Sequence, residues 1–274
     1  MQNPSLCHKK NQCNVKNFTV IDLTMISLGD PIASNAVLSA LQINSRDKII
    51  SIKEKANADS NFVITHIIKQ IIHEKNRLCL VNFHNPIEHY QSIGKKLGYD
   101  LLKAVDDGLV KVIEPIKDIV ENIGCEDSYL QENKENIVKD LYFNIKDCVN
   151  ALKTDGKVVY LLIDDLSHLH DLDIDIKHTL LFVHYCISLT DRDDVCFILN
   201  NHVSTHTDNI ISKNLDYVAD VNVKVSSLKT GKSQDVTGYL NVRRGNDLSC
   251  YHYKAFDRGI KTFRPGESIH HLYK

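Results

Sequence analysis

The residues best placed to do chemistry are two neighbouring carboxylates, Asp164 and Asp165, which directly follow the apolar run 158–163. At the carboxyl end of a parallel strand, such a pair can hold the Mg²⁺ of a bound nucleotide, provided that a phosphate site faces it. The same pair can instead mark a plain boundary between strand and helix, with one carboxylate capping the helix. The loop that would carry the phosphate site separates these interpretations.

A phosphate-binding loop needs glycines whose backbone amides turn toward the phosphates, a lysine for the outer phosphates and an adjacent hydroxyl for Mg²⁺. The loop between the first expected strand and helix, residues 53–61, contains no glycine. Its Glu54 and Asp59 would place negative charge where phosphate binds. We therefore expect no working phosphate loop and interpret Asp164 and Asp165 as a strand boundary. A degenerate ATP site is the alternative.

A second polar cluster follows this carboxylate pair within one short segment. It consists of His168, His170, Asp171, Asp173, Asp175 and His178. Histidines and carboxylates at the carboxyl edge of a sheet can form a metal site or an acid/base site. Their spacing matches no known ligand motif, and the Asp-x-Asp-x-Asp run lacks the glycine and distal glutamate of a calcium loop. We interpret the segment as a solvated connection, with a metal or acid/base cluster as the alternative.

The C-terminal part of the chain is locally basic and rich in aromatic residues. The cations are Arg243, Arg244, Lys254, Arg258, Lys261 and Arg264, and Tyr251, Tyr253 and Phe256 lie among them. On a β surface these side chains can follow a phosphate backbone and stack bases, or they can form a protein interface. A solvated strand face is the third interpretation. The candidate contacts for RNA or a neighbouring subunit are Arg243, Arg244, Arg258 and Arg264.

Other chemistry finds little support in the sequence. Serine catalysis would need an elbow such as Gly-x-Ser-x-Gly, and none is present. A zinc site would rest on Cys7, His8 and Cys13, which lack a second closely spaced pair of ligands. The eight scattered cysteines are typical of free thiols in a reducing compartment. We therefore predict no catalytic, cofactor-binding or metal-binding residue and no enzyme.

Alternating patterns predict the elements that position these residues. Expected strands are 49–52, 78–83, 109–113, 158–163 and 195–199, and expected helices are 60–72, 86–97, 137–152 and 176–187. Asn85 is the expected N-cap of the second helix, with Pro86 at its first position and Gly98 as its left-handed end. The stretch from 114 to 132 is expected to be irregular. The strand-like runs 217–225, 236–242, 250–255 and 260–263 then follow with no helix between them, as in an antiparallel meander.

Composition limits the class of protein and its partners. The chain has 274 residues with 33 basic and 35 acidic side chains, so no global field attracts nucleic acid or a membrane surface. No apolar run approaches the length of a membrane span. No linker divides the chain, so we expect a flexible tail over 1–20 and one domain over 21–274. The expected fold is a doubly wound, mainly parallel α/β sheet with antiparallel C-terminal strands.

Several segments together resemble the family of Elongator complex subunit six. They are 78–101, with His89-Tyr90 and the run 94–98, then 160–188, with Ile163–Ser167 and Phe182-x-His184-Tyr185-Cys186, and finally 235–264. No single motif is specific, but their order and spacing extend over about residues 20–265.

The resemblance implies a RecA-like fold without its own phosphate loop. It also implies a non-catalytic scaffold subunit that alternates with Elongator subunits four and five in a hetero-hexameric ring. That ring would dock on the catalytic Elongator subcomplex and contact tRNA during wobble-uridine modification. The expected location is the cytoplasm, with the nucleus left open. A divergent ATPase and a recombinase-paralogue-like DNA-binding module are the competing interpretations.

Overall fold

A computed structural model describes residues 35–55, 57–121, 134–154, 156–191, 194–231, 233–257 and 259–267. The tail over 1–20 and Arg258 therefore lie outside the described residues. The described helices are α1 (Ala36–Leu41), α2 (Asn61–His73), α3 (Ile87–Leu97), α4 (Leu101–Asp106), α5 (Pro115–Glu121), α6 (Lys134–Leu152), α7 (His168–Asp171), α8 (Ile176–Ser188), the 3₁₀ helix η2 (Leu189–Asp191) and α9 (His206–Val218). The described strands are β1 (Ile49–Lys55), β2 (Arg77–Val81), β3 (Val110–Ile113), β4 (Val159–Ile163), β5 (Val195–Val203), β6 (Val221–Ser227), β7 (Gly238–Arg244), β8 (Asp247–Phe256) and β9 (Gly259–Phe263).

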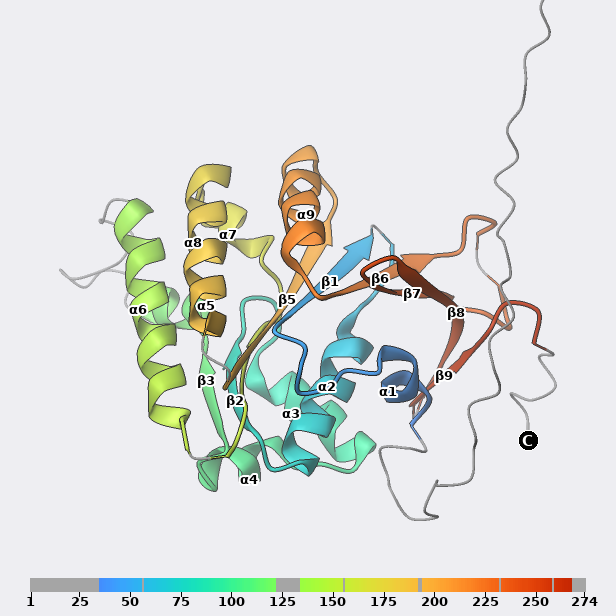
Figure 1. The fold of residues 1–274 in the computed structure, drawn as a ribbon, viewed down its shortest axis with the longest axis horizontal. Coiled ribbons are helices and arrows are strands. Elements are labelled where there is room, and N and C mark those ends of the chain that lie inside the picture. Colours follow the sequence, from blue (N-terminus) through green and yellow to red (C-terminus); the bar gives the residue numbers. More distant parts are fainter. Residues whose placement is uncertain are drawn as a thin grey trace, which may run out of the picture.

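The described strands form one sheet of nine, in the order β3-β2-β4-β5-β1-β6-β7-β8-β9. The pairs from β3 to β6 are parallel, and β6 to β9 form an antiparallel meander. Figure 1 shows the meander continuing the parallel sheet toward the red end of the chain. The predicted class of a mainly parallel sheet with antiparallel C-terminal strands is confirmed.

Helices cover both faces of the parallel part (Figure 1). Helices α1, α2, α3 and α4 pack into one core layer, and α6, α8 and α9 pack into the other. Strand β4 is buried along its whole length, as expected of a central strand covered on both faces. Among the described residues, the sheet separates the two cores. The carboxyl ends of the central strands therefore lie between the two helix layers.

Local sequence explains the helices that were predicted correctly. Isoleucines recur with helical spacing in α2, and Ile67, Ile68 and Ile71 are all buried on one side of the helix. Helix α3 ends at Gly98, whose φ of 86° is the left-handed conformation that glycine adopts without a steric penalty. Within the described residues, no helix combines the length and apolar character needed to cross a bilayer.

Three local predictions are wrong. Asn85 does not cap α3, because its backbone and side-chain N–H groups donate to Asp164 and Asn61; Pro86 takes the N-cap position instead. The stretch after Ile113 is not irregular throughout, since α5 occupies 115–121. The strand expected from Tyr217 starts only at Val221, because the preceding residues form α9.

Helix α9 was not predicted from the spacing of apolar residues, but its first turn carries a capping signal. Thr205 and Asp208 form a reciprocal capping box, in which each side chain accepts from the other residue's backbone N–H. Such a box satisfies two otherwise unpaired N–H groups at a helix start. The Thr-x-x-Asp spacing at 205–208 was therefore a usable signal for the start of this helix.

Candidate functional site

A cavity of about 370 Å³ lies at the carboxyl ends of β1, β4 and β5, beside the start of α2. We call it the carboxyl-edge cavity. All of its lining residues except Ala58 have polar side chains; they are Glu54, Ala58, Asp59, Ser60, Asn61, His84, Asn85, Asp164, Asp165, Ser167, His168, Asn200 and His202. In a doubly wound sheet this edge is where ligands bind. The carboxyl-edge cavity therefore contains both the carboxylate pair, Asp164 and Asp165, and residues of the loop 53–61.

The start of α2 is already occupied by a carboxylate of the chain itself. Glu54 Oε2 accepts from the backbone N–H of Ser60 at 2.7 Å and from its hydroxyl at 2.6 Å. Asp59 Oδ1 accepts from the Asn61 N–H at 2.8 Å. A helix N-terminus attracts anions, and phosphate loops use this position for phosphate. Here Glu54 and Asp59 supply the negative charge that a phosphate would otherwise bring.

Asp164 anchors the loop that joins β2 to α3. Its carboxylate accepts from the backbone N–H groups of Phe83, His84 and Asn85 and from the Tyr90 hydroxyl. The side chain is buried, and burial raises the pKa of Asp164 while these hydrogen bonds pull it down. All the described donors come from this loop and helix, so the carboxylate serves to hold them in place. This agrees with the strand-boundary interpretation, although the carboxylate holds a loop and does not cap a helix.

Asp165 uses one oxygen to shape the next turn and presents the other to the cavity. Oδ1 accepts from the Ser167 N–H and hydroxyl at 2.9 and 2.8 Å and from the His202 N–H at 3.2 Å. Oδ2 lies 4.0 Å from His168 Nε2. His202 in turn places Nδ1 2.6 Å from Glu54 Oε1. The polar side chains around the cavity therefore form a network of internal pairs.

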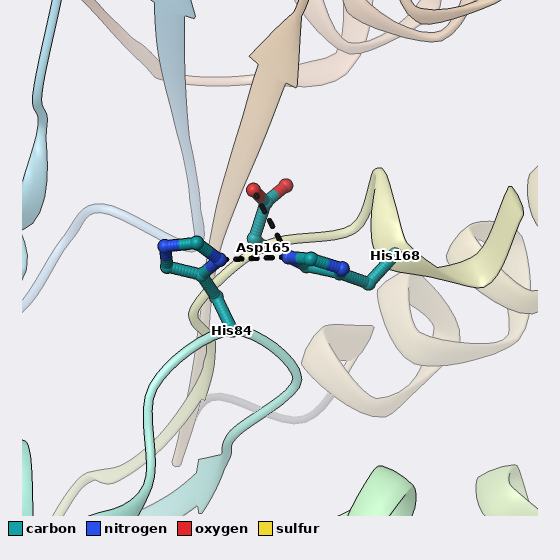
Figure 2. Close-up of side chains that lie close together, drawn as sticks. All are labelled: His84, Asp165 and His168. Atoms are coloured by element: carbon teal, nitrogen blue, oxygen red, sulfur yellow. Dashed lines mark hydrogen bonds and ion pairs between the residues drawn. The ribbon is translucent and has the colours of Figure 1, made fainter. Parts of the chain in front are cut away.

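The histidine and aspartate segment after β4 is divided by the structure. His168 points into the cavity and lies beside His84 of the β2–α3 loop (Figure 2). His170 donates from Nδ1 to the Ile174 carbonyl, and His178 pairs with Asp175 at the start of α8. Only His168 therefore joins the cavity, and its partner His84 was not singled out from the sequence because it lies 84 positions away.

A second concavity, of about 750 Å³, lies between α9 and strands β1, β6 and β7. It is lined by Lys53, Lys55, Lys213, Asp216, Tyr217, Asn222, Val223, Lys224, Asn241, Arg243 and Leu248. We call it the basic cleft, because five cations surround one carboxylate. Strand alternation explains it: Ile52, Val223 and Val242 point into the core, so their neighbours Lys53, Lys224 and Arg243 share the opposite face.

The charges of the basic cleft are incompletely compensated. Asp216 lies 3.2 Å from Lys53 Nζ and 3.8 Å from Arg243 Nη2. The pKa of Lys55 is lowered by partial burial and by the positive charges of Lys53 and Lys224. Tyr217 stands at the rim with 89% of its surface exposed. Cations that repel one another beside an exposed aromatic ring favour an anionic ligand such as a phosphate backbone.

The four predicted contact arginines have different surroundings. Arg243 lines the basic cleft and donates to the Asp216 carbonyl. Arg244 forms a two-pronged ion pair with the buried Asp47 and also donates to the carbonyls of Leu41 and Gln42. Arg264 lies exposed after β9, and Arg258 is not among the described residues. The structure thus joins Arg243 to four lysines that the sequence analysis did not single out.

The chain does contain a Gly-Lys-Ser triplet, at 231–233, outside the loop examined for phosphate binding. Gly231 lies in the connection between β6 and β7, two antiparallel strands. A phosphate loop instead joins a strand to the helix whose N-terminus faces the phosphates. This triplet therefore does not have the context of a phosphate loop.

Comparison with known proteins places the chain in a family. The family model described as "Elongation complex protein 6" matches residues 34–257. The chain belongs to this family. Among curated relatives, Elongator complex protein 6 of Homo sapiens is 24% identical in an alignment of 241 residues that covers 78% of this chain and 89% of the relative. The Danio rerio protein of that name is 26% identical in an alignment of 239 residues that covers 77% of this chain and 88% of the relative.

A solved structure gives the fold. An uncharacterized protein of Pyrococcus horikoshii, solved in complex with an unknown peptide, superposes with a TM-score of 0.58 at 13% identity. The match covers 80% of this chain and 92% of that one. The fold is RecA-like, as the resemblance implied. The segments that carry the resemblance contribute to both concavities: 78–101 and 160–188 bring His84 and Asp165 to the carboxyl-edge cavity, and 235–264 brings Arg243 to the basic cleft.

Proposed function

We propose that this chain is a scaffold subunit of Elongator that supports tRNA wobble-uridine modification without catalysing it. The observation that carries the proposal is the family match over residues 34–257. Curated relatives named Elongator complex protein 6 are covered over nearly their full length, which supports the same role here. The partners are Elongator subunits four and five in a hetero-hexameric ring, and through that ring the catalytic subcomplex. The proposed location is the cytoplasm.

The carboxyl-edge cavity supports a role without nucleotide chemistry of its own. At the start of α2, Glu54 accepts a hydrogen bond from the Ser60 N–H. Asp164 accepts hydrogen bonds from three backbone N–H groups. A triphosphate entering here would meet two carboxylates where a phosphate loop offers free N–H groups. We therefore expect no Mg²⁺-dependent binding of ATP to the isolated chain in a calorimetric titration. Tight binding that needs Mg²⁺ would favour the divergent ATPase instead.

The ring is tested by co-expression of this chain with subunits four and five and measurement of the particle mass by light scattering. We expect a mass that fits two copies of each subunit. A persistent monomer that ignores both partners would refute the scaffold assignment and limit the resemblance to the fold.

The basic cleft supports a direct contact with tRNA inside the ring. It offers Lys53, Lys55, Lys213, Lys224 and Arg243 around one carboxylate, with Tyr217 exposed beside them. Phosphate contacts by lysine and arginine provide most of the affinity for nucleic acid, and an exposed ring can stack on a base. Of the four arginines expected at such a contact, Arg243 is the one that we assign to the cleft.

A further inference from the structure

The most specific group that the proposed function does not use is the trio His84, Asp165 and His168. Each offers one potential ligand atom, and these three atoms all lie within 4.8 Å of one another. Figure 2 shows the side chains converging from the β2–α3 loop, the end of β4 and the start of α7. No other such group of three occurs among the residues that the structure describes.

The two imidazoles meet at nitrogen atoms. His84 Nδ1 lies 2.8 Å from His168 Nε2, and the ring centroids are 5.0 Å apart with an angle of 26° between the planes. The other nitrogen of His168, Nδ1, lies 2.7 Å from Asp171 Oδ2. An ionised carboxylate only accepts hydrogen bonds, so this contact assigns the Nδ1 proton of His168. In the neutral ring, Nε2 then keeps its lone pair and accepts a hydrogen bond from Nδ1–H of His84. A metal ion at this point would take the place of that proton.

The third ligand is oriented in the same way. Oδ1 of Asp165 is held by Ser167 and the His202 N–H, and Oδ2 faces His168. The neighbouring carboxylate, Asp164, is fully used by backbone donors and Tyr90. Asp165 and His168 are thus oriented by partners outside the trio, and Asp164 holds the loop of His84 through the His84 backbone N–H. This is the arrangement by which outer groups orient metal ligands and fix the histidine tautomer.

We propose that His84 Nδ1, His168 Nε2 and Asp165 Oδ2 bind a divalent transition metal, with Zn²⁺ as the best match. Zinc accepts histidine and carboxylate ligands together, whereas Ca²⁺ and Mg²⁺ require oxygen ligands throughout. Three protein ligands leave a fourth position for water or a small anion, and the cavity of about 370 Å³ has room for it. The ion would also join the β2–α3 loop to the α7 turn. This inference is independent of the proposed assembly.

The test is a titration of the full-length chain, stripped with a chelator, with Zn²⁺ followed by calorimetry. We expect one Zn²⁺ bound per chain at this site, and the loss of one equivalent in His84→Ala and in His168→Ala. Asp171→Asn should keep the equivalent but weaken binding by about 10–100-fold, because Asp171 orients His168 without being a ligand. Circular dichroism of each variant checks that it is folded.

His178→Ala is a closely matched control. His178 Nδ1 lies 2.8 Å from Asp175, with 23% of the histidine side chain exposed, against 2.7 Å and 27% for His168 and Asp171. It belongs to no group of three ligands, so its removal should leave the Zn²⁺ stoichiometry and affinity unchanged. If His178→Ala costs as much as His168→Ala, binding is a general property of surface histidines and the site is refuted.

A Co²⁺ titration of the unaltered chain gives a second readout that does not depend on variants. Nitrogen and oxygen ligands give d–d absorption without the thiolate-to-metal charge-transfer band that cysteine ligands produce. We expect d–d bands alone, displaced by Zn²⁺. A charge-transfer band in place of them, or an unchanged equivalent in the His84→Ala, His168→Ala double variant, would overturn the proposal.

Discussion

The carboxyl-edge cavity and the basic cleft both include residues of β1, Glu54 in the first and Lys53 in the second, but the charges of the two are compensated differently. In the cavity, Glu54 and Asp164 are met by backbone N–H groups and neighbouring side chains of the same chain. In the cleft, Lys53, Lys55 and Lys224 come from adjacent parallel strands, and partial burial together with the positive charges of the other two lowers the pKa of Lys55.

This difference separates structure from recognition. A buried carboxylate that is left without donors destabilises the fold, so the anions of the cavity are bound to the loops that they hold. The five cations of the cleft outnumber its one carboxylate, so positive charge remains available for an external anion. Substitutions in the cavity should therefore change mainly the free energy of unfolding, and substitutions in the cleft mainly the affinity for a ligand.

The largest expected effect is that of Asp164→Ala. This change leaves three backbone N–H groups and the Tyr90 hydroxyl without their acceptor in a buried site. We expect the free energy of unfolding to fall by about 3–5 kcal/mol. Urea denaturation measures it, and Glu88→Ala, an exposed acidic change on α3, should stay within about 0.5 kcal/mol. Equal effects for the two variants would contradict the anchoring role of Asp164.

The adjacent arginines Arg243 and Arg244 sharpen the same contrast. Arg244→Ala should lower the free energy of unfolding by about 2–3 kcal/mol, because Asp47 is buried and loses a two-pronged partner. Arg243→Ala should cost well under that, since its contacts to Asp216 are longer and more exposed. Thermal unfolding of both variants compares them directly. A larger loss for Arg243→Ala would reverse the roles assigned here.

The sequence predicted the central strands well because unbroken apolar runs such as 158–163 fit only one kind of environment. The absence of glycine from the loop before α2 is visible in the sequence. The hydrogen bonds from Ser60 at the start of that helix to Glu54 were not predicted. What it could not provide is proximity across long separations. His84 and His168, or Lys53 and Lys224, meet only because parallel strands place distant carboxyl ends side by side.

The C-terminal arginines show the same limit at short range. A local basic composition grouped Arg243 with Arg244, but strand alternation places them on opposite faces of β7. One then faces the lysines of β1 and β6, and the other reaches the end of α1. Lys53 and Lys55 lie on the strand face opposite buried Ile52, and Lys224 lies on the face opposite buried Val223. Taken together, these two alternating patterns were a usable signal for the cleft.

A smaller effect is expected on tRNA binding when the charge of the cleft is reversed. Lys224→Glu should weaken tRNA binding by the assembled ring about 10-fold at moderate salt and lower its salt dependence by about one phosphate contact. Lys103→Glu, on α4 in the opposite helix layer, is the control and should change affinity little. Filter binding at several salt concentrations measures both. Equal losses would indicate a general charge effect and exclude a specific contact at the cleft.

The smallest expected effect tests whether the lysines of the cleft oppose one another in the folded protein. Lys55→Gln removes one of three neighbouring positive charges, so we expect it to raise the free energy of unfolding by about 0.2–0.5 kcal/mol at low salt. Added salt should abolish the gain, because these charges are largely screened by solvent. Lys96→Gln, on the exposed side of α3, should show no such gain.

The pH dependence of this gain has a definite sign. Because the pKa of Lys55 is lowered in the folded protein, the unfolded chain holds this proton to higher pH than the folded chain does. The stability of the unaltered protein therefore rises relative to Lys55→Gln as pH increases toward the ordinary lysine pKa of about 10.4. Denaturation of both proteins at neutral and alkaline pH measures the difference. A gain that persists unchanged at alkaline pH would mean that Lys55 acts through packing and not through its charge.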